Sequence, residues 1–383
     1  MRRLAACCFA SLLAAAGAWA APAQDPPAPG PYRAPPTPVA VASVPAPGQV
    51  LAVPQPLRQM LRERVMARHS GRGQRLQALV EMIFGTQALD LQYDPLATYT
   101  LAEIWQTRRA NCLAFTLLFA TLAREAGIQA RVQEVDRVVS WYQDQNQGVV
   151  YSVGHVNVGV LVDGRSGTVD LDRNILYDRR GPQPISLDRA LAHFYNNRGA
   201  ERMTVGDTVG ARAFFNAALA QAPEFAPTWN NLGVLDSRQG DLAGARAALE
   251  TSLRLDARGD SALTNASVLY RRLGLVAQAQ ALERRLKAVQ RDDPFAQYMA
   301  GASAERSGDL ATAIRYYRRA VQLYDSAHQF HFGLARAYFL SGQMARADHE
   351  LMRARALGGS SNAQRYQAKL DGLARLRTQQ ARR

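Results

Sequence analysis

The chain has 383 residues, 48% of them hydrophobic and 20% charged, and a formal net charge of +14. This length allows two or more domains that each bury a core of their own. The arginines form no run interleaved with aromatic residues and no nucleic-acid motif, so nucleic acid is not an expected partner. The positive charge instead favours solubility and attraction to anionic polymers of a cell envelope.

The first twenty residues have the pattern of a secretory signal peptide. A basic start, Met1–Arg3, precedes an apolar run, Leu4–Gly17, and the small-x-small sequence Ala18–Ala20. The pattern predicts cleavage after residue 20 and export to the periplasm or the medium. The apolar run is short for a membrane span, and no later stretch reaches the roughly 18 apolar residues that a span needs, so no transmembrane segment is expected.

Two of the three cysteines lie inside this leader. Cys7 stands before the apolar region and not after it, so lipid anchoring is not expected. Cleavage removes Cys7 and Cys8 and leaves Cys112 as the only thiol. Cysteines in an oxidising compartment are usually paired, which makes a solitary thiol notable. Its plainest interpretation is a small buried hydrophobic residue.

Residues 21–56 hold twelve of the eighteen prolines, with Ala, Val and Gly between them. This composition disfavours helix and sheet and predicts an extended or disordered linker. Apolar residues at three- and four-residue spacings then predict two amphipathic helices, Leu57–His69 and Gln74–Phe84. We expect these helices to cover the domain that follows, which is predicted to span residues 57–190.

The middle of the chain predicts two more helices and a strand. Thr100 and Glu103 have the spacing of a capping box, which starts a short helix. A second helix begins near Cys112 and is apolar nearly all round, so it should be buried. Gly127 ends this helix, and Ile128–Val135 is predicted as a strand.

A β-hairpin follows. Residues 149–162 alternate, with Val156, Val158, Val160 and Val162 on one face and His155 and Asn157 on the other. The dipeptide Asp163-Gly164 predicts the turn, and Thr168–Leu171 returns as the partner strand. On that strand Asp170 and Asp172 share one face.

From residue 192 to residue 361 the chain repeats with a period of 34, in five units. Small residues at positions 8 and 20 allow two antiparallel helices to touch, and position 15 makes the turn between them. Position 15 is glycine in all five units: Gly206, Gly240, Gly274, Gly308 and Gly342. The pattern resembles tetratricopeptide repeats, which implies an all-α solenoid. The third unit departs most, with Glu283 and Leu286 where an aromatic and a small residue are usual. A basic C-terminal helix and tail, 362–383, is predicted to cap the array.

The thiol, the histidine and the two aspartates could together carry chemistry. A helix N-terminus and a nearby histidine both lower the pKa of a thiol and so favour the nucleophilic thiolate. Cys112 has the first condition, and His155 could supply the second as general base and acid. Asp170 or Asp172 could then fix the tautomer of the imidazole.

These residues also resemble a known family. The run Asn111–Phe115, the helix that continues to Val132, Gly154–Val156 and Thr168–Asp170 are similar to the core of the transglutaminase-like superfamily. The resemblance covers about residues 85–180. It implies an α+β domain with a papain-type order of Cys, His and Asp. Cys112 would be the nucleophile, His155 the base and acid, and Asp170 the orienting carboxylate, with Asp172 as the fallback.

The sequence differs from the superfamily at two positions near these residues. Ala110 stands where many members have glycine, and Asn157 stands where many have tryptophan.

Three further residues are weaker candidates for the site. Gln106 could donate to an oxyanion beside the Cys112 backbone N–H, and Trp105 and Trp141 could line a cleft. Their plainer interpretations are a solvent-facing residue and core aromatics. The other histidines show no convincing metal-ligand spacing, and neither a metal nor a cofactor is expected.

The sequence therefore predicts an α+β transglutaminase-like domain followed by an all-α tetratricopeptide-repeat solenoid. The leading function is an exported cysteine enzyme that acts on amide bonds, by hydrolysis or by acyl transfer, while the concave face of the repeats binds a protein or peptide. The alternative is a non-catalytic adaptor with a structural transglutaminase-like head, because a fold does not establish an activity. Binding of an envelope polymer is a third hypothesis.

Overall fold

The computed structural model describes residues 43–135, 142–144, 149–151, 155–171, 181–358, 366–367 and 369–371. The chain divides into two compact units, one of which spans Thr37–Val289, while the other holds Gln290–Arg383. The boundary lies near the end of a repeat helix. The predicted leader and most of the predicted linker lie outside the described residues.

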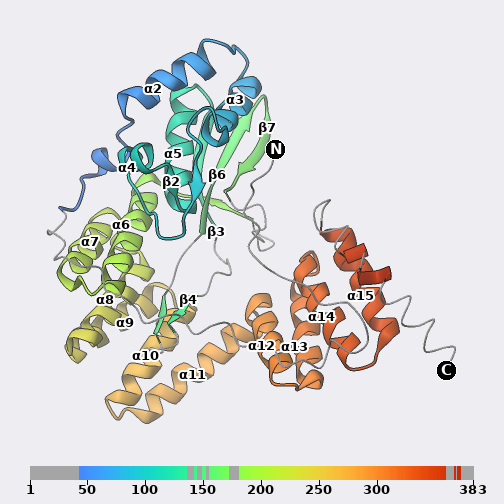
Figure 1. Cartoon of the computed structure of the whole chain (residues 1–383). Helices are drawn as coiled ribbons and strands as arrows, with labels where there is room; N and C mark the ends of the chain where they lie inside the picture. Colours follow the sequence, from blue (N-terminus) through green and yellow to red (C-terminus); the bar gives the residue numbers. More distant parts are fainter. Residues whose placement is uncertain are drawn as a thin grey trace. The chain divides into compact units, whose positions relative to one another are not determined.

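Helices at the start of the first unit cover its core (Figure 1). They are α1 (Pro47–Val50), α2 (Gln55–Leu61), the π-helical turn η2 (Arg62–Met66) and α3 (Arg72–Phe84). The apolar face that the sequence predicts is buried, with Leu57, Leu61, Val65 and Leu79 fully covered.

The end of the expected linker differs from the prediction. Val50 and Val53 are buried in the same core as the helices, and Val44 packs against it, so residues 44–56 belong to the domain. Pro47 occupies the first turn of α1, where a missing backbone N–H costs little. Proline is therefore compatible with this packed segment, and the valines supply its apolar surface.

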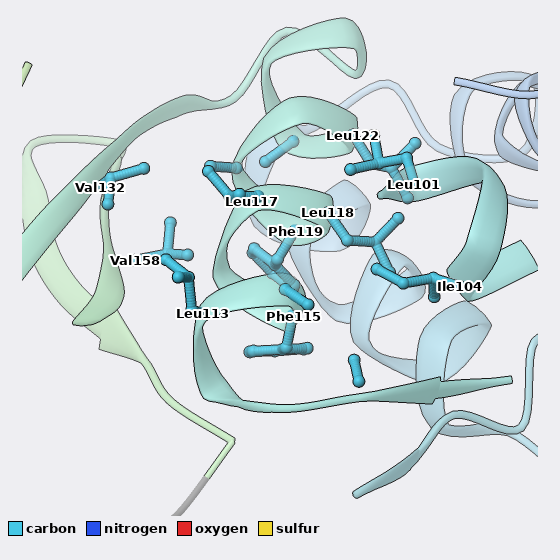
Figure 2. Close-up of a cluster of buried hydrophobic side chains, with 14 of the residues drawn as sticks. Leu101, Ile104, Leu113, Phe115, Leu117, Leu118, Phe119, Leu122, Val132 and Val158 are labelled. Atoms are coloured by element: carbon cyan, nitrogen blue, oxygen red, sulfur yellow. The ribbon is translucent and has the colours of Figure 1, made fainter. Parts of the chain in front are cut away.

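The central element of the unit is α5 (Cys112–Glu125), which is apolar on nearly every side and almost wholly buried. It follows α4 (Leu101–Thr107), which starts with the predicted capping box. Between the two helices, β2 (Arg109–Ala110) pairs in parallel with β1 (Gln92–Tyr93). Figure 2 shows Val132 and Val158 of the sheet on one side of α5, and Leu101 and Ile104 of α4 on the other.

A four-stranded sheet has the order β7-β6-β3-β8. Its strands are β3 (Gln129–Val135), β6 (His155–Val162), β7 (Arg165–Val169) and β8 (Gln183–Pro184). The predicted turn at Asp163-Gly164 joins β6 to β7, and both residues have positive φ. The predicted strand over 149–162 is in fact two strands, because β5 (Val149–Tyr151) pairs with β4 (Tyr142–Asp144) in a separate hairpin.

Antiparallel helix pairs make up the rest of the described chain, as the 34-residue period predicts. The first unit holds α6 (Leu187–Thr204), α7 (Thr208–Gln221), α8 (Ala226–Gln239), α9 (Leu242–Leu255), α10 (Asp260–Arg272) and α11 (Val276–Arg291). The second holds α12 (Pro294–Arg306), α13 (Leu310–Leu323), α14 (His328–Leu340) and α15 (Met344–Leu357). The glycine at position 15 has φ between 74° and 84° in every pair, a conformation that other residues rarely adopt.

The third pair shows why its sequence departs from the repeat. Glu283, at the position usually held by an aromatic residue, accepts two hydrogen bonds from Arg271 at 2.7 and 2.9 Å. Leu282 and Leu286 supply the apolar contact to α10. In the third pair, these leucines make the contact between helices that a buried ring makes in other pairs, and an exposed ion pair lies beside them.

Of the predicted C-terminal helix, residues 366–367 and 369–371 are described, and Tyr366 is buried against Leu351 and Ala354. Within the described ranges, no helix is long and apolar enough to cross a membrane.

Candidate active site

Cys112 is the first residue of α5, and its side chain is partly exposed. The chain reaches it through a sharp turn at Arg108, which has a φ of 59° and ends α4. Ala110 is fully buried and lies in β2. The left-handed residue of this turn is therefore Arg108, and Ala110 needs no glycine-like conformation.

Asn111 caps the helix that Cys112 begins. Its Oδ1 accepts a hydrogen bond from the Ala114 N–H at 2.9 Å, and its Nδ2 donates to Thr98 Oγ1 at 2.7 Å. Asn111 and Thr98 are both buried. The cap keeps the first turn of α5 helical, so its backbone N–H groups remain directed toward the end where the thiol lies. That end of a helix favours a negative charge.

His155 and Asp170 form a buried pair on neighbouring strands. His155 Nε2 lies 2.7 Å from Asp170 Oδ2, and the two side chains are 7% and 9% exposed. Asp170 follows the last residue of β7, and the register Val158↔Val169 places it near the start of β6. Asn157 Nδ2 donates to the same Oδ2 at 3.2 Å. The carboxylate therefore meets two nitrogen atoms from one face of β6.

The helix of Cys112 packs against the strand of His155. Thr116 stands one helical turn after Cys112, and its Oγ1 donates to the carbonyl of Val156 at 3.2 Å. Val156 directly follows His155. This bond brings the N-terminal turn of α5 to the start of β6, the end of the strand that carries the imidazole.

The weaker candidates have different positions. Trp105 is partly buried, and the Arg108 guanidinium carbon lies 4.0 Å from the centre of its ring. Gln106 is exposed on α4. Trp141 and Asp172 lie outside the described residues, and their assigned roles stay predictions. Among the residues that the structure describes, no group of three or more His, Cys, Asp or Glu side chains could hold a metal.

A buried charged cluster connects β3 to α6, and the sequence did not reveal it. Glu134 pairs with Val156 in register, so it points to the same side of the sheet as the valines. Its carboxylate lies 3.1 Å from His193 Nε2 and 3.2 Å from Arg189 Nε. Burial alone would raise the pKa of Glu134, but the hydrogen bonds and charges of His193 and Arg189 outweigh it and lower the pKa to about 2. An acidic residue at an inward position of a strand was the available signal.

A second cluster lies between α6 and the turn before Cys112. Glu201 accepts a hydrogen bond from the Thr98 N–H at 3.3 Å, and Arg198 donates to the Thr98 carbonyl at 3.3 Å. Burial raises the pKa of Glu201 to about 7, although the Thr98 bonds and the Arg198 charge act in the opposite direction. Nothing in the spacing of these residues indicated the contact.

The fold defines the class of this protein. An α+β domain with a cysteine-initiated buried helix and a following antiparallel sheet is joined to a run of repeated helix pairs. Residues 59–166 match the model of the transglutaminase-like superfamily, and residues 226–258 match that of the tetratricopeptide repeat. The chain thus contains a transglutaminase-like domain followed by tetratricopeptide repeats. The first match includes Cys112 and His155 and ends before Asp170.

No curated protein matches the chain. Similar solved structures include MamA 41-end from Desulfovibrio magneticus RS-1, which is 16% identical with a TM-score of 0.26 and covers 44% of this chain and 96% of its own. The Cut9–Hcn1 hetero-tetramer of APC/C is 20% identical with a TM-score of 0.28, covering 49% and 37%. YrrB, a TPR protein with an unusual peptide-binding site, is 16% identical with a TM-score of 0.25, covering 44% and 87%.

Proposed function

We propose that this chain is an exported cysteine enzyme that acts on amide bonds. Cys112 is the nucleophile, His155 the general base and acid, and Asp170 the carboxylate that orients the imidazole. The observation that carries the proposal is the buried contact of 2.7 Å between His155 and Asp170. This pair lies on a sheet that packs against the helix beginning at Cys112.

The hydrogen bond between the imidazole and Asp170 assigns a role to each ring nitrogen. Because Nε2 faces the carboxylate, it carries the proton of that hydrogen bond, and Nδ1 is the atom that exchanges a proton with the thiol. The carboxylate also favours the imidazolium that forms when the thiol gives up its proton. Asn157 holds the same carboxylate oxygen from β6.

The reaction then follows from these roles. The thiolate sulfur attacks the amide carbonyl carbon, and the electron pair of the C=O bond moves to oxygen. Backbone N–H groups at the start of α5 stabilise this oxyanion. The electron pair of the oxyanion then re-forms the C=O bond as the C–N bond breaks, the leaving amine takes the proton of the imidazolium, and a thioester to Cys112 remains. Attack by water on this thioester breaks the C–S bond and releases a carboxylic acid and the Cys112 thiol, whereas attack by an amine breaks the same bond and forms a new amide.

We further propose that the repeats bind the protein or peptide on which this domain acts. A cavity between α8 and α10 supports this role. Its lining includes Val234, Ser237, Arg238, Asn265, Val268 and Arg272. Two guanidinium groups beside valines suit a peptide that carries carboxylates, because arginine binds carboxylates through paired hydrogen bonds.

Export is part of the proposal and rests on the leader predicted at residues 1–20. Mass spectrometry of the N-terminus of the protein recovered outside the cytoplasm tests it. The expected mature chain begins at Ala21.

The rate at which iodoacetamide labels Cys112 tests the catalytic proposal. At neutral pH, Cys112 should react far faster than free cysteine, and His155→Ala should slow the reaction roughly a hundredfold. His349→Ala is the matched control, because His349 is exposed on α15. Equally slow labelling of the wild type and His155→Ala would leave the non-catalytic adaptor as the function.

A further inference from the structure

The residue before the proposed nucleophile is held by a segment that lies well before it in the chain. Asn111 donates its backbone N–H to the Ala97 carbonyl at 3.0 Å and its side-chain Nδ2 to Thr98 Oγ1 at 2.7 Å. Ala97 and Thr98 are fully buried. The position of Asn111 therefore depends on where residues 97 and 98 lie.

Helix α6 holds that segment from its other side. The Thr98 N–H donates to Glu201 Oε1, and Arg198 donates to the Thr98 carbonyl, each at 3.3 Å. Arg198 extends the contact to Glu103 at 3.3 Å, and Glu103 belongs to the capping box of α4. All three polar groups of Thr98 are thus engaged by Asn111 and α6.

Thr98 connects these bonds to the cap of α5. Its backbone is held by Glu201 and Arg198, while its Oγ1 accepts from Asn111 Nδ2. With Nδ2 bonded to Thr98, the Oδ1 of the same amide is directed to the N-terminus of α5. There Oδ1 accepts from the Ala114 N–H at 2.9 Å. Glu201 thereby holds the residue to which the capping amide of Asn111 is bonded.

We propose that Glu201, acting through Thr98 and Asn111, is a positioning residue for Cys112. Because α6 is also the first helix of the repeat array, one helix both starts the repeats and fixes the turn before the nucleophile. The effect on reactivity rests on the proposed role of Cys112, whereas the effect on the helix cap does not.

Hydrogen exchange of the Ala114 amide tests the cap directly, in the full chain. Thr98→Val keeps the shape of the side chain but removes the hydroxyl, and Glu201→Gln keeps the shape of the side chain but offers a neutral, weaker acceptor to the Thr98 N–H. Both variants should speed Ala114 exchange roughly fivefold, the usual worth of an N-cap. Thr98→Ser should restore the wild-type rate. Asp188→Asn, at an exposed position of α6, should not change it.

Unchanged Ala114 exchange in folded Thr98→Val would overturn the proposed cap. Unchanged exchange in Glu201→Gln alone would remove Glu201 from it. Glu201→Gln is nearly isosteric, so it keeps the test decisive if Thr98→Val does not fold.

Iodoacetamide labelling of Cys112 in the same variants tests the link to the nucleophile. Thr98→Val and Glu201→Gln should label roughly fivefold more slowly at neutral pH, and Thr98→Ser should recover the rate. Wild-type reactivity in a variant with accelerated Ala114 exchange would overturn the positioning role while leaving the proposed function intact. A wild-type thiol no faster than free cysteine would instead overturn the proposed function, and the exchange experiment would still decide the cap.

Discussion

At the scale of single residues, the side chains that contact the Asp170 carboxylate decide how it can act on His155. Asp170 Oδ2 meets His155 Nε2 at 2.7 Å and Asn157 Nδ2 at 3.2 Å. Asn157, which stands where many members of the superfamily have tryptophan, therefore has a local partner in this chain. Two nitrogen atoms at one oxygen hold the carboxylate in place beside the imidazole.

Asp170→Asn should separate charge from shape at this position. The variant keeps the size of the side chain but removes the negative charge that favours an imidazolium. Labelling of Cys112 by iodoacetamide at neutral pH should fall roughly tenfold to a hundredfold. Asp188→Asn, on the surface of α6, is the control. A labelling rate equal to that of the wild type would show that Asp170 does not support the base.

Glu134 should make the free energy of unfolding depend on pH in the acid range. Its pKa in the folded protein is about 2, below the ordinary 4.5, because the hydrogen bonds and charges of His193 and Arg189 outweigh the opposing effect of burial. Its contribution is therefore complete above pH 4.5 and is lost as the pH falls toward 2. Glu134→Gln should lower the free energy of unfolding near neutral pH by up to about 3 kcal/mol. Urea unfolding at a series of pH values measures both effects. A variant with the acid dependence of the wild type would contradict this assignment.

At the scale of elements, helix pairs meet through small residues. The hydrogen atom of Gly233 in α8 is all that fits against α9, since a Cβ there would lie 2.6 Å from Leu249 Cγ. The same relation holds for Gly199 against Phe215 and Gly301 against Tyr317. The small residue at position 8 of the repeat thus faces the large residue at position 24.

Gly233→Ala should destabilise the repeats by about 1–3 kcal/mol, because the added methyl group must displace Leu249 or separate the two helices. Gly48→Ala is the control, since a Cβ at Gly48 has no atom within 4 Å and α1 tolerates alanine. Urea unfolding of the two variants compares them. Equal stability of both would show that the α8–α9 contact relaxes without cost.

At the scale of the whole molecule, the transglutaminase-like domain and the first helices of the repeats share one core within the unit Thr37–Val289. Leu191, Phe194 and Tyr195 of α6 are buried in the same core as α5 and the sheet. Phe225, which precedes α8, also belongs to this core and makes an edge-to-face contact with His193, with ring centres 4.5 Å apart. The first helix of the repeats is therefore part of the domain.

Truncation should reveal this shared core. A fragment of residues 43–186 lacks α6 and should not unfold cooperatively, because it exposes the apolar surface that α6 covers. A fragment of residues 43–289, which keeps the described residues of the first unit, should retain a cooperative transition. Circular dichroism during heating distinguishes them. A cooperative transition in the shorter fragment would show that the domain folds without α6.

Local patterns in the sequence predicted much of this fold. The five glycines at position 15, the capping box of Thr100 and Glu103 and the turn at Asp163-Gly164 are found where they were expected. Each depends on residues close together in the chain. The packing of residues 44–56 onto the domain was missed, because proline-rich composition resembles that of a linker whether or not valines beside it are buried.

The sequence by itself determined the α+β domain, the repeats and the candidates Cys112, His155 and Asp170, because helix periodicity, strand alternation and spacing are local properties. Only the tertiary structure decided that His155 meets Asp170, since Asp170 and Asp172 share one strand parity. It also decided that Glu201 bonds Thr98, a residue 103 positions away, behind the cap of the Cys112 helix. Contacts between residues so far apart leave no periodic pattern, and they arise only when helices and strands pack together.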